Sequence, residues 1–60
     1  MWIELHDYER IHTVYMVNTD SICVIYPGRT GSGKCFTRVK LANDGEILAH
    51  ESMKEIRELM

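Results

Sequence analysis

A glycine-rich heptapeptide is the part of this chain whose residue types and spacing could perform chemistry. Residues 28–34 read Gly-Arg-Thr-Gly-Ser-Gly-Lys. This fits the phosphate-loop pattern G-x-x-x-x-G-K, in which backbone N–H groups cradle phosphates and the lysine reaches the β and γ oxygens. However, Cys35 stands where a Ser or Thr hydroxyl would bind magnesium, and Phe36 to Val39 reads as a strand instead of the helix that such a loop precedes. A hairpin tip is the favoured interpretation, and phosphate or nucleotide binding at 28–34 is kept as the second alternative function.

Other catalytic or metal-binding groups lack a suggestive spacing. The chain has three histidines and two cysteines but no Cys-x-x-Cys pair, so we expect neither a metal site nor another cofactor. If Cys23 lies on a strand and Cys35 in the loop leading to its neighbour, the two do not face each other at the separation that a disulfide requires. The serines show no nucleophile-elbow spacing, and 60 residues leave little concave volume. We therefore predict no enzyme activity and no catalytic residues.

Positive charge gathers in the middle of the chain. There is no Asp or Glu between Ser21 and Asn43, whereas the carboxylates lie in the two flanks. We call residues 29–40 the basic window, and its cations are Arg29, Lys34, Arg38 and Lys40. Cations beside the ring of Phe36 could bind single-stranded nucleic acid, so a nucleic-acid-binding regulatory module is the first alternative function. The net charge of −2 favours an ordinary solvated strand face instead, because phosphate binding rests on excess positive charge.

The elements that must position these residues are mostly strands. Five stretches are predicted to be strands, at residues 2–6, 11–17, 22–26, 36–42 and 46–50. Apolar and polar residues alternate as in half-buried strands at 2–6, 11–17 and 36–42, and 22–26 is rich in β-branched and aromatic residues. Pro27 is expected to end the third strand because it cannot donate to a ladder, which leaves 27–34 as a mobile tip. Asn43-Asp44-Gly45 predicts a tight antiparallel reversal. The second strand has apolar groups on both faces, so it is either central in the sheet or covered at an interface.

A short helix is expected to close the chain. Ser52 followed by Glu55 is a capping box, which marks a helix start. The apolar residues that recur at helical spacing, and that are expected to pack on the sheet, are Met53, Ile56, Leu59 and Met60.

These elements predict one domain over residues 1–60, mainly β, built as a small antiparallel five-stranded curled or barrel-like sheet with one C-terminal helix. A domain of this size buries only about 60% of the surface that its unfolded chain exposes. Self-association is the expected source of additional stability, because disulfides and metal are not indicated. No apolar stretch approaches the roughly 20 residues that cross a bilayer, and no charged segment precedes an apolar run at the start. We expect a cytoplasmic protein without membrane insertion.

Four short segments follow one another in the order found in a known family. They are Met1 to Leu5, Met16 to Asn18, Val39 to Asn43 and Glu51 to Ile56. Together with Asp20, Ile22 and Gly45 they resemble the small FlbD-like proteins. The resemblance implies a strand-rich, non-enzymatic domain linked to motility in flagellated bacteria, and similar short proteins occur in phage and mobile elements. The long glycine-rich tip, Asp44 and the Ala49-His50 pair depart from the family pattern.

A second resemblance covers fewer residues. The segment Arg10 to Asn18, followed by Ile22, is similar to the R-x-H-x-S-[YF]-x-V-N segment of LytTR-type DNA-binding domains, which are also β-rich and end in a short helix. The chain matches at most the C-terminal part of such a domain. Glu51 replaces a basic residue that precedes the last helix in that family, and a carboxylate there would repel phosphate.

The sequence thus predicts a non-enzymatic protein-interaction or assembly module of bacterial or phage origin. Its expected partners are further copies of itself and another, unidentified protein, and nucleic acid is the alternative partner.

Overall fold

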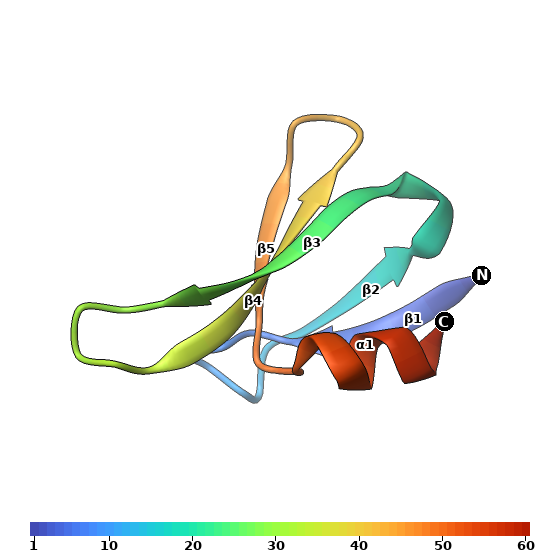
Figure 1. Cartoon of the computed structure of the whole chain (residues 1–60). Coiled ribbons are helices and arrows are strands. Elements are labelled where there is room, and N and C mark those ends of the chain that lie inside the picture. The colour runs from blue at the N-terminus through green and yellow to red at the C-terminus, as the bar shows by residue number, and fades with distance from the viewer.

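The computed structural model describes residues 1–60 as two small antiparallel sheets and one helix (Figure 1). The elements are β1 (Trp2–His6), β2 (Val14–Asn18), the 3₁₀ turn η1 (Thr19–Ser21), β3 (Ile22–Arg29), β4 (Cys35–Leu41), β5 (Glu46–Ala49) and α1 (Met53–Leu59). One sheet is the β1–β2 hairpin, and the other has the order β3-β4-β5. The prediction of a mainly β chain with a C-terminal helix is confirmed. The prediction of a single five-stranded or barrel-like sheet is wrong.

Backbone hydrogen bonds between the strands of the two sheets are confined to a short junction. The backbone N–H of His50 donates to His6 O (2.7 Å), and that of Tyr8 donates to Leu48 O (3.0 Å), on either side of a bridge between Asp7 and Ala49. Pairing stops there because the His6 N–H donates to the side chain of Glu51 (2.9 Å) instead of to another strand. The chain also leaves the sheet at Ser52 to begin α1, so β5 has no further residues to pair with β1.

The second strand differs from the prediction in length and in position. It begins at Val14 instead of Ile11, because residues 10–13 form a turn in which the Thr13 N–H donates to Arg10 O (2.7 Å). The Asp7 carboxylate stabilises this connection by accepting from the Glu9 and Arg10 N–H groups (3.1 and 3.0 Å). Because β2 pairs only with β1, it is an edge strand, and the alternative of a central strand is wrong.

The third strand passes through Pro27 and ends at Arg29, three residues later than predicted. The Thr30 N–H donates to Lys34 O (2.8 Å). Because backbone N–H and C=O groups point to opposite sides at successive residues of a strand, those of Gly28 face β4 and those of Pro27 face away from it. Pro27 therefore sits where a missing N–H faces the free edge. The tip is reduced to residues 30–34, and it leads into strand β4, as predicted.

Two local predictions are confirmed. The β4–β5 reversal is tight: Asp44 has φ of 68°, and the Asn43 side chain accepts from the Gly45 N–H (2.9 Å). The capping box of α1 is complete, because Ser52 Oγ accepts from the Glu55 N–H (3.1 Å) and Glu55 accepts from the Ser52 N–H (3.0 Å).

The core lies between the two sheets and is closed by the helix. Its buried cluster consists of Ile3, Leu5, Val17, Val39, Ala49 and Ile56. The helix contributes only Ile56 to it, whereas Leu59 and Met60 are exposed. The predicted apolar face of the helix is therefore buried only in its first turns, and its last turn extends past the core. No helix is long and apolar enough to cross a membrane.

Candidate functional site

An apolar patch lies on the outer face of the β1–β2 hairpin. In its register Trp2 pairs with Asn18, Glu4 with Met16, and His6 with Val14. These residues share one face, and the alternate residues Ile3, Leu5 and Val17 enter the core. Trp2 is 63% exposed, Met16 60% and Val14 46%. We call these three residues the hairpin surface.

A groove adjoins the hairpin surface along β2. It has a volume of about 450 Å³ and is lined by all of β2 and Trp2, and on the opposite wall by Leu41, Ala42, Asn43 and Ile47. Leu41 and Ile47 pack against the core from its open side. The groove therefore marks the place where the two sheets diverge and the core is least covered.

The outer edge of β2 carries backbone groups without a strand partner. The Asp7 N–H donates to Thr13 O (3.0 Å) and the Thr19 N–H to Met1 O (2.8 Å), so the odd-numbered residues of β2 bond to β1. N–H and C=O groups alternate sides along an antiparallel strand. The backbone groups of Val14 and Met16 consequently point away from β1, toward the groove.

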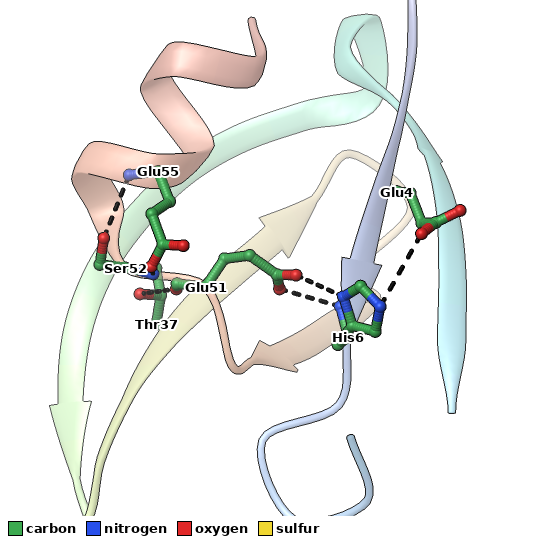
Figure 2. A network of polar contacts seen from close by, with 6 residues as sticks. All are labelled: Glu4, His6, Thr37, Glu51, Ser52 and Glu55. Atoms are coloured by element: carbon green, nitrogen blue, oxygen red, sulfur yellow. Dashed lines mark hydrogen bonds and ion pairs between the residues drawn. The ribbon is translucent and has the colours of Figure 1, made fainter. Parts of the chain in front are cut away.

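A polar network joins β1, β4 and the start of the helix (Figure 2). The Glu51 carboxylate accepts from the His6 backbone N–H (2.9 Å) and lies 2.5 Å from His6 Nδ1. The Thr37 hydroxyl donates to the Glu51 carbonyl oxygen (2.7 Å), and Glu4 lies 3.8 Å from His6 Nε2. Glu51 is buried. The His6–Glu51 pair holds the hairpin to the rest of the domain at the junction of the two sheets.

The network shifts the titration of both partners. The hydrogen bond to Glu51 raises the pKa of His6 above 6.5, and the charges of Glu51 and Glu4 act in the same direction while desolvation opposes them. For Glu51, burial alone would raise the pKa, but the hydrogen bonds from His6 outweigh it and lower the pKa below 4.5. Both shifts favour the ionised pair in the folded state.

We predict that this pair makes stability depend on pH. The raised pKa of His6 contributes stability that is complete below pH 6.5 and is lost as pH rises through the folded-state value. The lowered pKa of Glu51 contributes stability that is complete above pH 4.5 and is lost as pH falls through its folded-state value. The pair is therefore strongest between about pH 4.5 and 6.5.

Thermal melts at fixed protein concentration, from this pH range up to pH 8, measure the effect. Glu51→Gln keeps an acceptor for the His6 N–H but removes the charge, so its melting temperature is expected to change less between pH 6 and 8 than that of the wild type. His50→Gln, at an exposed histidine, is the matched control and should keep the wild-type profile. Equal pH profiles for the wild type and Glu51→Gln would show that the pair does not cause the dependence.

The predicted basic site is spread along the β3–β4 hairpin. Arg38 forms an ion pair with Glu46 (2.6 Å), and Lys34 lies over the ring of Tyr8 (5.6 Å). Arg29 lies opposite Cys35 at one end of the ladder, and Lys40 is five residues further along β4, about 17 Å away at strand spacing. The structure therefore leaves Arg29 and Lys40 well separated and gives Arg38 and Lys34 partners within the chain.

The aromatic part of that site also differs from the expectation. Phe36 is buried beneath Tyr8, whose ring centroid is 4.8 Å away, and Arg38 lies on the same ring at 5.6 Å. The ring of Phe36 is thus not open to a stacking base. Tyr8 was not among the residues that the sequence singled out, since it lies in a connection far from Phe36 along the chain.

The thiols and the possible metal ligands are also placed by the structure. Cys23 and Cys35 are free and exposed. No group of three or more His, Cys, Asp and Glu side chains is placed to hold a metal ion.

Sequence reasoning missed two features of this site. The sequence indicated Glu51 only through the two family resemblances, and nothing near it in the chain indicates that it contacts His6, 45 residues away. The hairpin surface did leave a signal, because Met16 and Val14 put apolar groups on the second face of β2 and Trp2 stands beside Glu4 and His6 on one face of β1.

Comparison with known proteins returned no match: no protein-family model, no curated protein and no solved structure matches this chain. The resemblances to FlbD-like proteins and to LytTR-type domains therefore stay predictions.

Proposed function

We propose that this chain is a small, non-enzymatic protein-interaction module that self-associates through the hairpin surface and the adjoining groove. The observation that carries the proposal is the exposure of Trp2, Met16 and Val14 on one face of an edge hairpin. Trp is among the residues that contribute most to protein interfaces, because its large ring loses much water-exposed area on binding. Clustered exposure of this kind marks an interaction site more often than scattered apolar residues do.

The energetics of a small core support the same proposal. Seven apolar residues are buried in the monomer, and a domain of this size gains little stability from its core alone. Association through a second apolar surface adds stability that rises with the logarithm of the protein concentration. Binding of a different protein through the same surface belongs to the proposal as well, with that partner covering Trp2.

Sedimentation velocity across a wide dilution range tests the proposal. We expect a dimer or larger species that dissociates on dilution, and a melting temperature that falls as the protein is diluted. Trp2 is the only tryptophan, so its fluorescence should shift to the blue as the protein concentration rises.

Trp2→Ser is expected to raise the dissociation constant about thirtyfold, the effect of removing an interface residue worth about 2 kcal/mol. Tyr26→Ser removes an exposed aromatic ring from β3 and is the matched control, expected to associate like the wild type. A wild type that stays monomeric at every concentration, with an unchanged melt, would contradict the proposal.

The two alternative functions stay predictions without a supporting site geometry. Nucleic-acid binding by Arg29, Lys34, Arg38 and Lys40 would have to use cations that the fold separates or pairs. Phosphate binding at residues 28–34 would have to use a loop that ends in strand β4, with no helix N-terminus directed at the anion.

A further inference from the structure

We propose that two copies of this chain pair edge to edge through β2, forming a continuous antiparallel sheet of the order β1-β2-β2-β1 about a two-fold axis near Met16. This inference rests on the proposed self-association and states its geometry. In this arrangement the two copies are held together by backbone hydrogen bonds of Val14 and Met16 as well as by the apolar side chains of the hairpin surface.

The two edges that lie away from the junction, on β2 and β3, differ in how they are protected. The outer edge of β3 carries Pro27 and Arg29 and is distorted by a register shift between Ile22 and Val24. Proline, charge and irregular register are the devices that prevent edge-to-edge pairing. The outer edge of β3 is therefore a poor template for another strand.

The outer edge of β2 has none of these devices. Its sequence is Val-Tyr-Met-Val-Asn, without charge, proline or glycine, and its register with β1 is regular over all five residues. The backbone groups of Val14 and Met16 point outward from it, as derived above. An unprotected edge of this kind pairs readily with another extended strand.

A second copy of β2 is the occupant that this edge fits. In an antiparallel pair centred on Met16, the two Met16 residues exchange N–H to C=O bonds, and Val14 lies beside Asn18 of the second copy. A two-fold interface is self-complementary, because each copy presents the same residues. No charged side chain of β2 meets its own copy across the seam.

Charge complementarity at both ends of the strand favours the antiparallel direction. Asp20 follows β2 and Arg10 precedes it, and both are exposed. Antiparallel pairing brings Asp20 of each copy to the end occupied by Arg10 of the other, whereas parallel pairing would set like charges together. Opposite charges across an interface select partner and register.

The side chains of the paired strands would also cover what the monomer leaves open. On the outer face, the row formed by Trp2 and Asn18 continues to Val14 of the second copy, so the Trp2 ring can lie across the seam. On the inner face, the half-buried Tyr15 of the second copy would lie toward Leu41 and Ile47 in the groove. Both apolar regions of the site are thereby used by one arrangement.

Met16→Pro tests the backbone bonds across the seam. Met16 and Glu4 are opposite each other without bonds between their backbones, so proline at position 16 removes an outward N–H and spares the β1–β2 ladder. Met16→Val, similar in size to proline and with the N–H retained, is the matched control. We expect the dissociation constant from sedimentation to rise at least about tenfold for Met16→Pro relative to Met16→Val, since two bonds are lost per dimer.

Amide hydrogen exchange on the wild type tests the backbone bonds across the seam without a substitution, so the test does not depend on whether a variant folds. The Val14 and Met16 amides should exchange at least about tenfold more slowly in concentrated protein than in dilute protein, because they bond only in the dimer. The outward amides of Ile25 and Arg29 on β3 should stay fast at every concentration and serve as the control.

The outcomes separate the inference from the proposed function. A dimer in which Met16→Pro and Met16→Val dissociate equally, with fast exchange at Val14 and Met16, would overturn edge pairing while Trp2→Ser still supports self-association. A protein that is monomeric throughout would overturn both. Slow, concentration-dependent exchange at Val14 and Met16 with weakening by Met16→Pro alone would support edge pairing.

Discussion

Replacing Ile56 with alanine is expected to lower the free energy of unfolding by about 2–5 kcal/mol. Ile56 is fully buried and is the only residue of α1 in the core cluster. Truncation removes its transfer free energy and leaves a cavity between the two sheets. A chain of this length has a total stability of about 3–9 kcal/mol, so this one change removes a large share of it.

Leu59→Ala is the matched control for this experiment. It makes the same kind of substitution in the same helix, but Leu59 is 45% exposed, so we expect a change within about 0.5 kcal/mol. Urea unfolding followed by far-UV circular dichroism gives both values, at one protein concentration below the dissociation constant of the dimer. Equal losses for the two variants would mean that the last turn of the helix contributes as much to stability as Ile56 does.

Gly28→Ala is expected to destabilise the protein by about 1–3 kcal/mol, the range for overpacking a filled site. A Cβ atom at position 28 would lie 2.4 Å from Cε1 and 2.7 Å from Cζ of Phe36. The ring has little room to move, because Phe36 is buried and Tyr8 covers it at 4.8 Å. The cause is steric, since Gly28 does not have a positive φ.

Gly31→Ala provides the comparison within the same glycine-rich segment. No atom lies within 4 Å of a Cβ at position 31, so this variant should unfold within about 0.5 kcal/mol of the wild type. Urea unfolding gives both stabilities, and the ring proton shifts of Phe36 report directly on its displacement in Gly28→Ala. An unchanged Phe36 spectrum together with wild-type stability would contradict the packing role of Gly28.

This pair of variants also bears on the phosphate-loop pattern. Gly28 is the first glycine of that pattern, and its smallness is explained by the ring of Phe36 on the paired strand. Gly33, the last glycine, has φ of 89° at the hairpin tip, a conformation that glycine adopts without steric cost. Both glycines thus have structural reasons that need no bound phosphate.

The features that could be predicted from the sequence are those that depend on neighbours along the chain. The β4–β5 turn forms because Asn43, Asp44 and Gly45 tolerate its backbone angles. The helix begins at Ser52 because Ser52 and Glu55 satisfy each other's backbone N–H groups. Alternation of apolar residues likewise indicated β1 and β4, although the end of β3 was misplaced because Pro27 is compatible with an outer edge.

The arrangement of the strands depends on contacts between distant parts of the chain. Whether five strands form one sheet or two was settled at the junction of His6 and Glu51, which are 45 residues apart. The burial of Phe36 by Tyr8 has the same non-local origin, whereas the Arg38–Glu46 pair joins neighbouring strands of one hairpin. Periodicity shows that a strand has two faces, but it does not say what covers each face.

Local sequence was therefore enough for the β-rich class, the tight turn and the capped helix, because each rests on bonds between residues only a few positions apart. The candidate binding site required the folded chain. Trp2, Val14 and Met16 share one exposed face only because β1 and β2 pair in this register, and β2 keeps a free edge because no strand pairs with it on the side away from β1. The divergence of the hairpin from β5 after one bridge follows from a buried carboxylate taking a backbone N–H that a neighbouring strand would otherwise have bonded.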